Sequence, residues 1–199
     1  MLRPLAEQLA ALAAPRADET VLELSSGDGE LNARLRGTAG AAAGTVVVIA
    51  PSRHLPFDDN AFDLAVSLLA IDAGDGLPAT LSELARVAGR AHVVVWGNGA
   101  THENALRDAW RDLGGDDAAT AVADAPPLPP EWTRSTLTDV ARFDGINQLW
   151  QAMITERGVT VSAGQEQALR ERLQHHVAKY TAADGTMRIP VRAALLSLR

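Results

Sequence analysis

The fold is decided by one short stretch near the amino terminus, Val21-Leu22-Glu23-Leu24-Ser25-Ser26-Gly27-Asp28-Gly29-Glu30-Leu31. Its first residues are apolar apart from one acid, which predicts a buried parallel strand. Leu31 and Leu35 share one face of the helix that is predicted to follow. Gly27 and Gly29 permit backbone angles and a close backbone approach that a Cβ would obstruct. Because open α/β sheets bind ligands at the carboxyl ends of their strands, this turn is the first candidate site.

The composition limits the classes of protein to which the chain can belong. The chain has 199 residues, 47% of them hydrophobic, which is enough for one full core. A net charge of -7 and the lack of a basic run argue against nucleic acid as a partner. No segment is apolar enough to span a bilayer, and the amino terminus has no signal-peptide pattern. With no cysteine, disulfides and thiolate metal sites are excluded. We therefore expect a cytoplasmic protein with neither a membrane partner nor a bound metal.

The first half of the chain alternates between helix and strand. Leucines at helical spacing predict an amphipathic helix over residues 2–14. Thr80 and Glu83 have the spacing of a capping box, which predicts a helix from Thr80 to Val87. The β-branched run at 45–50 has no alternation, which is typical of a strand buried on both faces. The remaining elements expected in this half are strands at 20–25, 62–71 and 91–96 and a short helix at 30–36.

The second half continues the alternation after a proline-rich connector. Thr101 and Asp144 are expected to cap helices, and residues 162–165 form a second capping box that opens a helix as far as Val177. Strands are expected at 136–143 and 187–198. Alternating strands and helices predict one α/β domain over residues 1–199 with a mostly parallel sheet.

This order of elements resembles the class I S-adenosylmethionine-dependent methyltransferases, most closely their small-molecule branch. In that family the first strand ends in a D/E-x-G-x-G-x-G block, matched at 23–29 with Ser25 in place of the first glycine. Residues 55–63, 81–87 and 184–191 resemble three later blocks of the family, in the same order. The resemblance implies a Rossmann-like three-layer sandwich whose mostly parallel sheet ends in an antiparallel strand.

The resemblance also implies a cofactor, S-adenosylmethionine, at the glycine turn. The backbone amides of the turn would lie against the methionine part of the cofactor. Glu23 would accept a charge-assisted hydrogen bond from its amino group, directly or through water. The alternative is that the two glycines only make a tight turn between strand and helix. The cofactor-binding residues implied are Glu23, Ser25, Ser26, Gly27, Asp28 and Gly29.

A dinucleotide site is the main rival at this turn. That fingerprint needs G-x-G-x-x-G, and Asn32 stands where the third glycine belongs. The phosphate-binding sequence G-K-[ST] does not occur in the chain. Glu23, Asp28 and Glu30 would moreover repel a pyrophosphate. Dinucleotide binding is therefore disfavoured.

The sequence departs from the family pattern after its second strand. Ala50 stands where the family has an acid that holds the ribose hydroxyls. A parallel crossover usually needs a dozen or more residues including a helix, yet residues 51–61 contain two prolines and no helical period. We therefore expect a fold reduced by about one strand and one helix. Each charge-assisted bond lost is worth roughly 1.5–3 kcal/mol, or about one to two decades in dissociation constant, which predicts weak or lost cofactor binding.

Few side chains are candidates for catalysis. Asp72 follows the strand predicted at 62–71, where the family often has a His or Asn facing substrate, so it is a candidate general base or a plain turn residue. His54 is either an exposed loop residue or a group at the pocket mouth. His175 and His176 are adjacent and diverge on a helix, so they cannot chelate one ion. Trp96 is expected at the pocket or in the core.

Two functions from different classes remain open. The first is S-adenosylmethionine-dependent methyl transfer to a small-molecule substrate, in which alignment of the reactants does most of the work. The second is a non-catalytic protein that keeps the fold as a binding or dimerisation module, as a homodimer or beside an active relative.

Overall fold

The computed structural model describes residues 3–25, 29–38, 45–49, 54–71, 76–96, 101–113, 127–155 and 161–198. The chain divides into two compact units. The first, here called the sheet unit, comprises Leu2–Asn98, Val122–Leu137 and Ala193–Arg199. The second, the helical unit, comprises Met1, Gly99–Ala121 and Thr138–Arg192. That the whole chain forms one methyltransferase-like domain stays a prediction.

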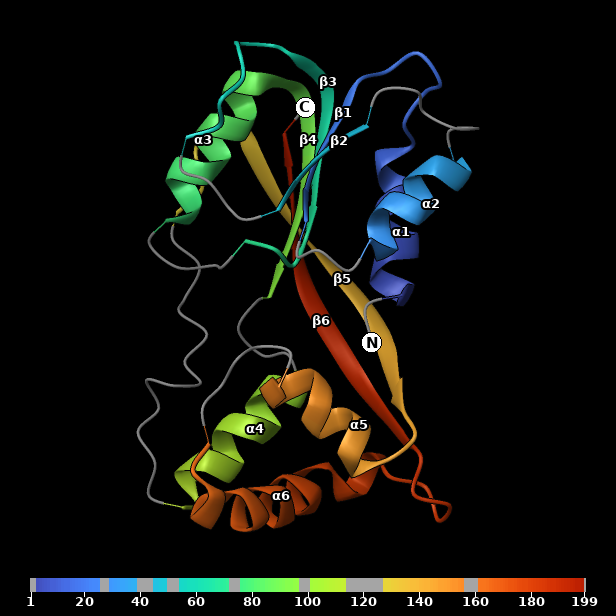
Figure 1. Ribbon diagram of the computed structural model, residues 1–199, viewed down its shortest axis with the longest axis vertical. Coiled ribbons are helices and arrows are strands. Elements are labelled where there is room, and N and C mark those ends of the chain that lie inside the picture. The colour runs from blue at the N-terminus through green and yellow to red at the C-terminus, as the bar shows by residue number, and fades with distance from the viewer. Residues whose placement is uncertain are drawn as a thin grey trace. The chain divides into compact units, whose positions relative to one another are not determined.

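The sheet has six strands in the order β2-β1-β3-β4-β6-β5 (Figure 1). β1 pairs in parallel with β2 and with β3, and β3 pairs in parallel with β4. β6 is antiparallel to β4. The predicted mostly parallel sheet with an antiparallel strand at its end is confirmed. The strands are β1 (Val21–Ser25), β2 (Thr45–Ile49), β3 (Phe62–Leu68), β4 (Ala88–Trp96), β5 (Trp132–Phe143) and β6 (Met187–Leu198).

Helices cover both faces of the sheet unit, which gives it three layers. On one face α1 (Arg3–Ala13) and α2 (Glu30–Thr38) pack in a cluster with Val21 and Leu64. On the other face α3 (Leu77–Val87) packs in a cluster with Leu22 and Leu24. Figure 1 shows α3 and the α1–α2 pair on opposite sides of the strands. The alternation of side chains along β1 therefore divides its apolar residues between two cores.

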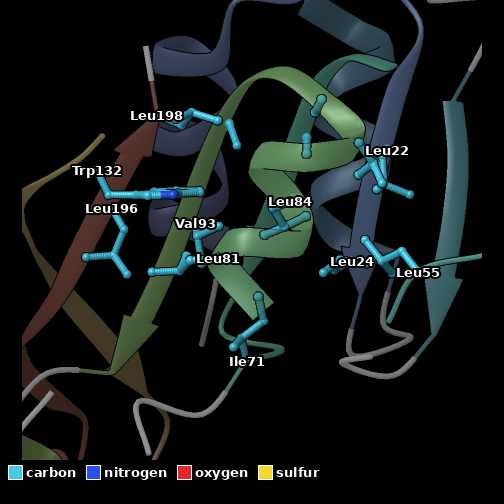
Figure 2. Close-up of a cluster of buried hydrophobic side chains, with 14 of the residues drawn as sticks. Leu22, Leu24, Leu55, Ile71, Leu81, Leu84, Val93, Trp132, Leu196 and Leu198 are labelled. Carbon is cyan, nitrogen blue, oxygen red and sulfur yellow. The ribbon is translucent and has the colours of Figure 1, made fainter. Parts of the chain in front are cut away.

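The connection from β2 to β3 is as short as the sequence predicted. It consists of residues 50–61, and its described part, 54–61, contains neither a helix nor a strand. Within this part Leu55 is fully buried and belongs to the same cluster as Leu22 and Leu24. Figure 2 shows the Leu55 side chain beside Leu24, on the face that α3 covers. The described part of the connection therefore contributes Leu55 to the core.

The helical unit has a core of its own. The inner faces of β5 and β6 carry Phe143 and Ile189 against α4 (Thr101–Arg111), α5 (Ile146–Trp150) and α6 (Ala163–Val177). α5 continues as a π-helical turn over Gln151–Thr155, and α6 ends in a 3-10 turn over Ala178–Tyr180. Among the described residues no helix is both long enough and apolar enough to cross a membrane.

Three predicted helix starts are wrong in detail. α3 begins at Leu77, before the supposed capping box, because Pro78 suits a first turn and the Thr80 hydroxyl donates to the carbonyl of Gly76. Thr101 lies within α4 as its first residue. Gly145, and not Asp144, is the N-cap of α5. Ser162 is the N-cap of α6, but its hydroxyl donates to the side chain of Gln165.

Candidate functional site

The connections between the first three strands define the place where a ligand is expected. β1 lies between β2 and β3, so the chain leaves β1 toward one side and returns on the other. Such a reversal is a topological switch point, and open α/β sheets bind ligands outside the carboxyl ends of the strands there. The carboxyl ends at this switch point belong to Ser25 on β1, Ile49 on β2 and Leu68 on β3.

Glu23 is the charged residue of β1. Its backbone pairs with Val47 on β2 and Val66 on β3, two residues before the end of β1. Glu23 is only 1% exposed. Burying a carboxylate is costly unless donors or a cation meet it. A buried acid at this place fits a group that binds the cationic amino end of a ligand.

The turn after β1 is partly described. Gly29 precedes α2 with a φ of 70°, a left-handed conformation that favours glycine, and no atom would obstruct a Cβ there. Glycine is thus required at this position by the backbone and not by crowding. Ser26, Gly27 and Asp28 lie outside the described residues, and Ser25 is the last residue of β1. The described part fits the expected turn between strand and helix.

Ser67 is a second polar residue at the switch point. It is the penultimate residue of β3 and lies in register between Leu24 on β1 and Val93 on β4. Its side chain is fully buried, and its hydroxyl has no hydrogen-bond partner among the residues that the structure describes. Sequence reasoning missed this residue because a serine inside an apolar run carries no distinctive pattern.

A cluster of charged and backbone groups fixes the connection that leads into β3. The Glu83 carboxylate accepts from the backbone N–H of Leu55 at 2.9 Å, and Arg86 donates to the carbonyl of Leu55 at 3.0 Å. Arg86 also donates to the carbonyl of Phe57 and to Asp59, both at 2.8 Å, and pairs with Glu83 at 2.8 Å. Both backbone polar groups of Leu55 are thereby held by side chains of α3. We call this arrangement the strap clamp.

The electrostatics of the strap clamp follow from its geometry. The hydrogen bond from Arg86, aided by the Leu55 N–H, lowers the pKa of Glu83 to about 2. Hydrogen bonds to the carboxylates of Glu83 and, second, Asp59 raise the pKa of Arg86 above its usual value. His54 is mostly exposed, and its Nδ1 lies 3.5 Å from a Glu83 oxygen. The Glu83 carboxylate therefore binds Leu55 and Arg86 and does not cap the start of α3, so the predicted capping box is wrong.

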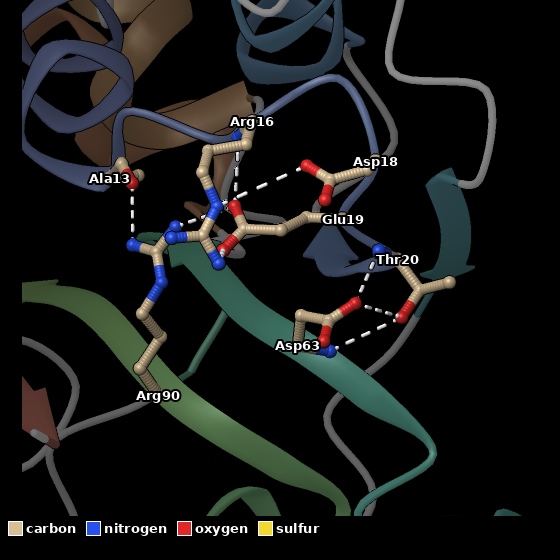
Figure 3. Close-up of polar contacts among 7 residues, drawn as sticks. All are labelled: Ala13, Arg16, Asp18, Glu19, Thr20, Asp63 and Arg90. Carbon is tan, nitrogen blue, oxygen red and sulfur yellow. Dashed lines mark hydrogen bonds and ion pairs between the residues drawn. The ribbon is translucent and has the colours of Figure 1, made fainter.

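A second polar cluster lies near the amino-terminal ends of β1 and β4 (Figure 3). Glu19, 4% exposed, accepts from the N–H of Arg16 at 2.8 Å and from Arg90 at 2.7 Å, and Arg90 also donates to the carbonyl of Ala13. Burial raises the pKa of Glu19, but these hydrogen bonds outweigh it and hold that pKa below its usual range. This cluster precedes β1 and joins it to the start of β4, so its role is structural.

The other candidates that the structure describes do not gather into a site. Asp72 lies outside the described residues. Trp96 ends β4 and packs against the cluster on the α1 face. His176 is 2.9 Å from Asp112, and its ring meets that of His175 edge to face. No group of three or more His, Cys, Asp or Glu suited to a metal occurs in the described part of the chain.

Comparison with known proteins adds the fold family. No family model and no curated protein matches the sequence. A protein from Anabaena variabilis, assigned as a methyltransferase of an antibiotic biosynthesis pathway, matches 98% of this chain over 96% of its own at 12% identity and a TM-score of 0.63. A protein assigned as a methyltransferase from Bacillus halodurans matches 98% of this chain over 97% of its own, at 13% identity and a TM-score of 0.58. The chain has the class I methyltransferase fold.

The likeness extends over the whole length of these proteins. YcgJ from Bacillus subtilis also has a TM-score of 0.58, with 98% of each chain covered at 15% identity. At such identities the agreement concerns the methyltransferase fold and not individual residues. The expected fold class is therefore confirmed, whereas the roles of Glu23, of the glycine turn and of Asp72 stay predictions.

Proposed function

We propose that this protein binds S-adenosylmethionine at the switch point and transfers its methyl group to a small molecule. The observation that carries the proposal is the buried acid Glu23, two residues before the end of β1 and followed by the left-handed Gly29, within a methyltransferase fold. An ionised carboxylate at this place is the group that would attract a cationic amino group. Its place matches the position that the sequence resemblance assigns to the cofactor's amino group.

The described residues suit the amino-acid end of the cofactor. The Glu23 carboxylate would accept from the amino group, and the turn that ends at Gly29 would bring backbone N–H groups against the methionine part. The bound cofactor supplies a methyl group on a sulfonium, which leaves it to the protein to align a nucleophile and exclude water. Asp72, four residues beyond the end of β3, is the proposed base that takes the proton from that nucleophile.

The short connection between β2 and β3 bears on affinity. Ala50 and the following residues offer no carboxylate for ribose at the place where the family has one. Because a charge-assisted bond is worth roughly 1.5–3 kcal/mol, we expect dissociation constants about ten- to a hundredfold weaker than a full site would give. The small-molecule substrate is proposed on the resemblance of the four sequence blocks alone.

The test is a thermal shift with S-adenosylhomocysteine, the product of methyl transfer. A ligand at one hundred times its dissociation constant stabilises by about 2.7 kcal/mol, which raises the melting temperature by several degrees. Glu23→Gln removes the charge and keeps the shape, and a dissociation constant weakened at least tenfold should reduce the shift by about half or more. Glu131→Gln, an exposed acid, is the matched control and should leave it unchanged. A wild-type protein that shows no shift at millimolar ligand contradicts the proposal and favours a non-catalytic binding or dimerisation module.

A further inference from the structure

The strands of the helical unit have one buried face and one exposed face. Side chains alternate between the two faces of a strand. The apolar odd-numbered residues of the neighbouring strands β5 and β6, such as Phe143 and Ile189, are buried in one cluster with residues of α4, α5 and α6. The even-numbered residues therefore share the opposite face, which we call the outer face. They are Thr138, Val140, Arg142, Arg188, Pro190 and Arg192, and all of them are exposed.

The charge of the outer face is opposite to that of the whole chain. The chain has 25 acidic against 18 basic residues, a net charge of -7. Half of the outer-face residues are nevertheless arginines, and none is acidic. Asp139 is the one acid in the sequence of β5 and β6, but it alternates to the other face, where it is half-buried and accepts from the N–H of Val140. The outer face thus has a local positive potential in an acidic protein.

The arginines of the outer face are not neutralised within the described part of the chain. Arg142, Arg188 and Arg192 form neither a hydrogen bond nor an ion pair with any residue that the structure describes. The charge of Asp184, in the turn before β6, acts on Arg188, but its carboxylate accepts from the N–H and the hydroxyl of Thr186 at 2.9 and 2.7 Å. Like charges on one face repel one another, and an anionic partner would relieve that repulsion.

The residue types of the outer face narrow the class of this partner. Val140 is 42% exposed, which is unusual for a large hydrophobic side chain in the described residues. The planar guanidinium of arginine pairs with carboxylates in a bidentate way, and arginine is enriched at protein interfaces. A long polyanion such as nucleic acid would meet the surplus of acids on the rest of the chain, whereas a short acidic segment needs only this face. A second copy docked through the same face would bring arginines against arginines.

We propose that the outer face of β5 and β6 is a docking surface for an acidic segment of another protein. Carboxylates of that segment pair with Arg142, Arg188 and Arg192, and an apolar side chain between them covers Val140. The inference goes beyond the proposed function and does not depend on cofactor binding, because every residue that carries it belongs to the helical unit.

The test is the binding of a defined acidic peptide, followed by fluorescence anisotropy at low ionic strength. The probe is a fluorescein-labelled octapeptide of six glutamates around two central valines. The variant that combines Arg142→Gln, Arg188→Gln and Arg192→Gln should weaken its binding about three- to a hundredfold, the product of three exposed ion pairs. Its melting temperature should be unchanged or higher, since no partner in the described residues is lost. Arg172→Gln is the matched control, because Arg172 on α6 is exposed and likewise has no ion pair in the described residues.

A second variant separates docking from attraction by charge alone. Val140→Ser keeps every charge and should weaken the binding of the peptide about two- to fivefold, because it removes apolar area from the contact. Salt should weaken binding to the wild type through screening. Duplex DNA and phosphatidylglycerol vesicles serve as rival anions.

Four results would overturn the inference. They are a wild-type protein that does not bind the peptide at millimolar concentration, an Arg172→Gln protein weakened as much as the triple variant, a Val140→Ser protein that binds as the wild type does, and tighter binding to DNA or vesicles than to the peptide. Binding of S-adenosylhomocysteine should be the same in all these variants, so the proposed function stands or falls separately.

Discussion

The Leu55 side chain offers the sharpest test of how this reduced fold is held together. Leu55 lies in the short connection between β2 and β3, where a surface loop would be expected, yet it is 0% exposed and packs with Leu22, Leu24 and Leu84. Truncating a fully buried leucine to alanine removes its transfer free energy and leaves a cavity. We therefore expect Leu55→Ala to lower the free energy of unfolding by about 3 kcal/mol, within a range of about 2–5 kcal/mol.

The assay is urea unfolding followed by circular dichroism and tryptophan fluorescence. Coincident transitions with an unchanged slope against denaturant would allow the midpoint shift to be converted into a free energy. Leu12→Ala is the matched control, because Leu12 on α1 is 49% exposed and its loss should cost less than about 0.5 kcal/mol. If Leu55→Ala cost no more than Leu12→Ala, the connection would not be part of the core and the reasoning about the reduced fold would be refuted.

Three further predictions concern the charged clusters and the glycine turn. Because the folded-state pKa of Glu83 is about 2, below its ordinary value of 4.5, its contribution to stability is present above about pH 4.5 and is lost as the pH falls toward 2. Glu83→Gln should thus be destabilising at pH 7 and nearly neutral at pH 2, and an equal effect at both values would disprove this assignment. Glu19→Gln should lower the free energy of unfolding at pH 7 by about 1.5–3 kcal/mol through lost hydrogen bonds to Arg16 and Arg90, and chemical denaturation that shows no loss would contradict it. Gly29→Ala should lower the free energy of unfolding by about 1 kcal/mol, because the φ of 70° at this position disfavours any residue with a Cβ. Gly37→Ala inside α2 should leave that free energy unchanged or raise it. A lower melting temperature for Gly37→Ala than for Gly29→Ala would be incompatible with the described turn.

Much of the fold was predictable because its signals are local. The unbroken apolar runs of β1, β2 and β3 marked buried parallel strands, and the residues available between Ala50 and Phe62 were too few for a helix and a further strand. The order of these elements then limited the topology to an α/β sheet with its switch point beside β1.

What the sequence could not supply depends on contacts between distant residues. Glu83 had the spacing of a capping box with Thr80, but tertiary contacts with Leu55 and Arg86 took its carboxylate. The spacing of Glu83 and Arg86, three apart on one helix, was the available signal for an ion pair. The partners of that pair lie about thirty residues earlier in the chain, where no periodicity points to them.

The candidate site was predicted in part. Glu23 and Gly29 were predicted because they belong to a motif. The structure adds that Glu23 is buried and that Gly29 has a left-handed backbone conformation. Ser67 belongs to no motif and became visible only when the sheet register placed a buried hydroxyl beside β1. The role proposed for Asp72 as the base is tested by Asp72→Asn, with ligand binding measured alongside to show that the variant is folded.

The most direct test of the central claim is calorimetric titration of the wild-type protein with S-adenosylhomocysteine. The account predicts saturable binding with one molecule per chain, weakened at least tenfold by Glu23→Gln, since a hydrogen bond to a charged group is worth roughly 1.5–3 kcal/mol. Absence of heat at millimolar ligand, or binding that Glu23→Gln leaves unchanged, would contradict it.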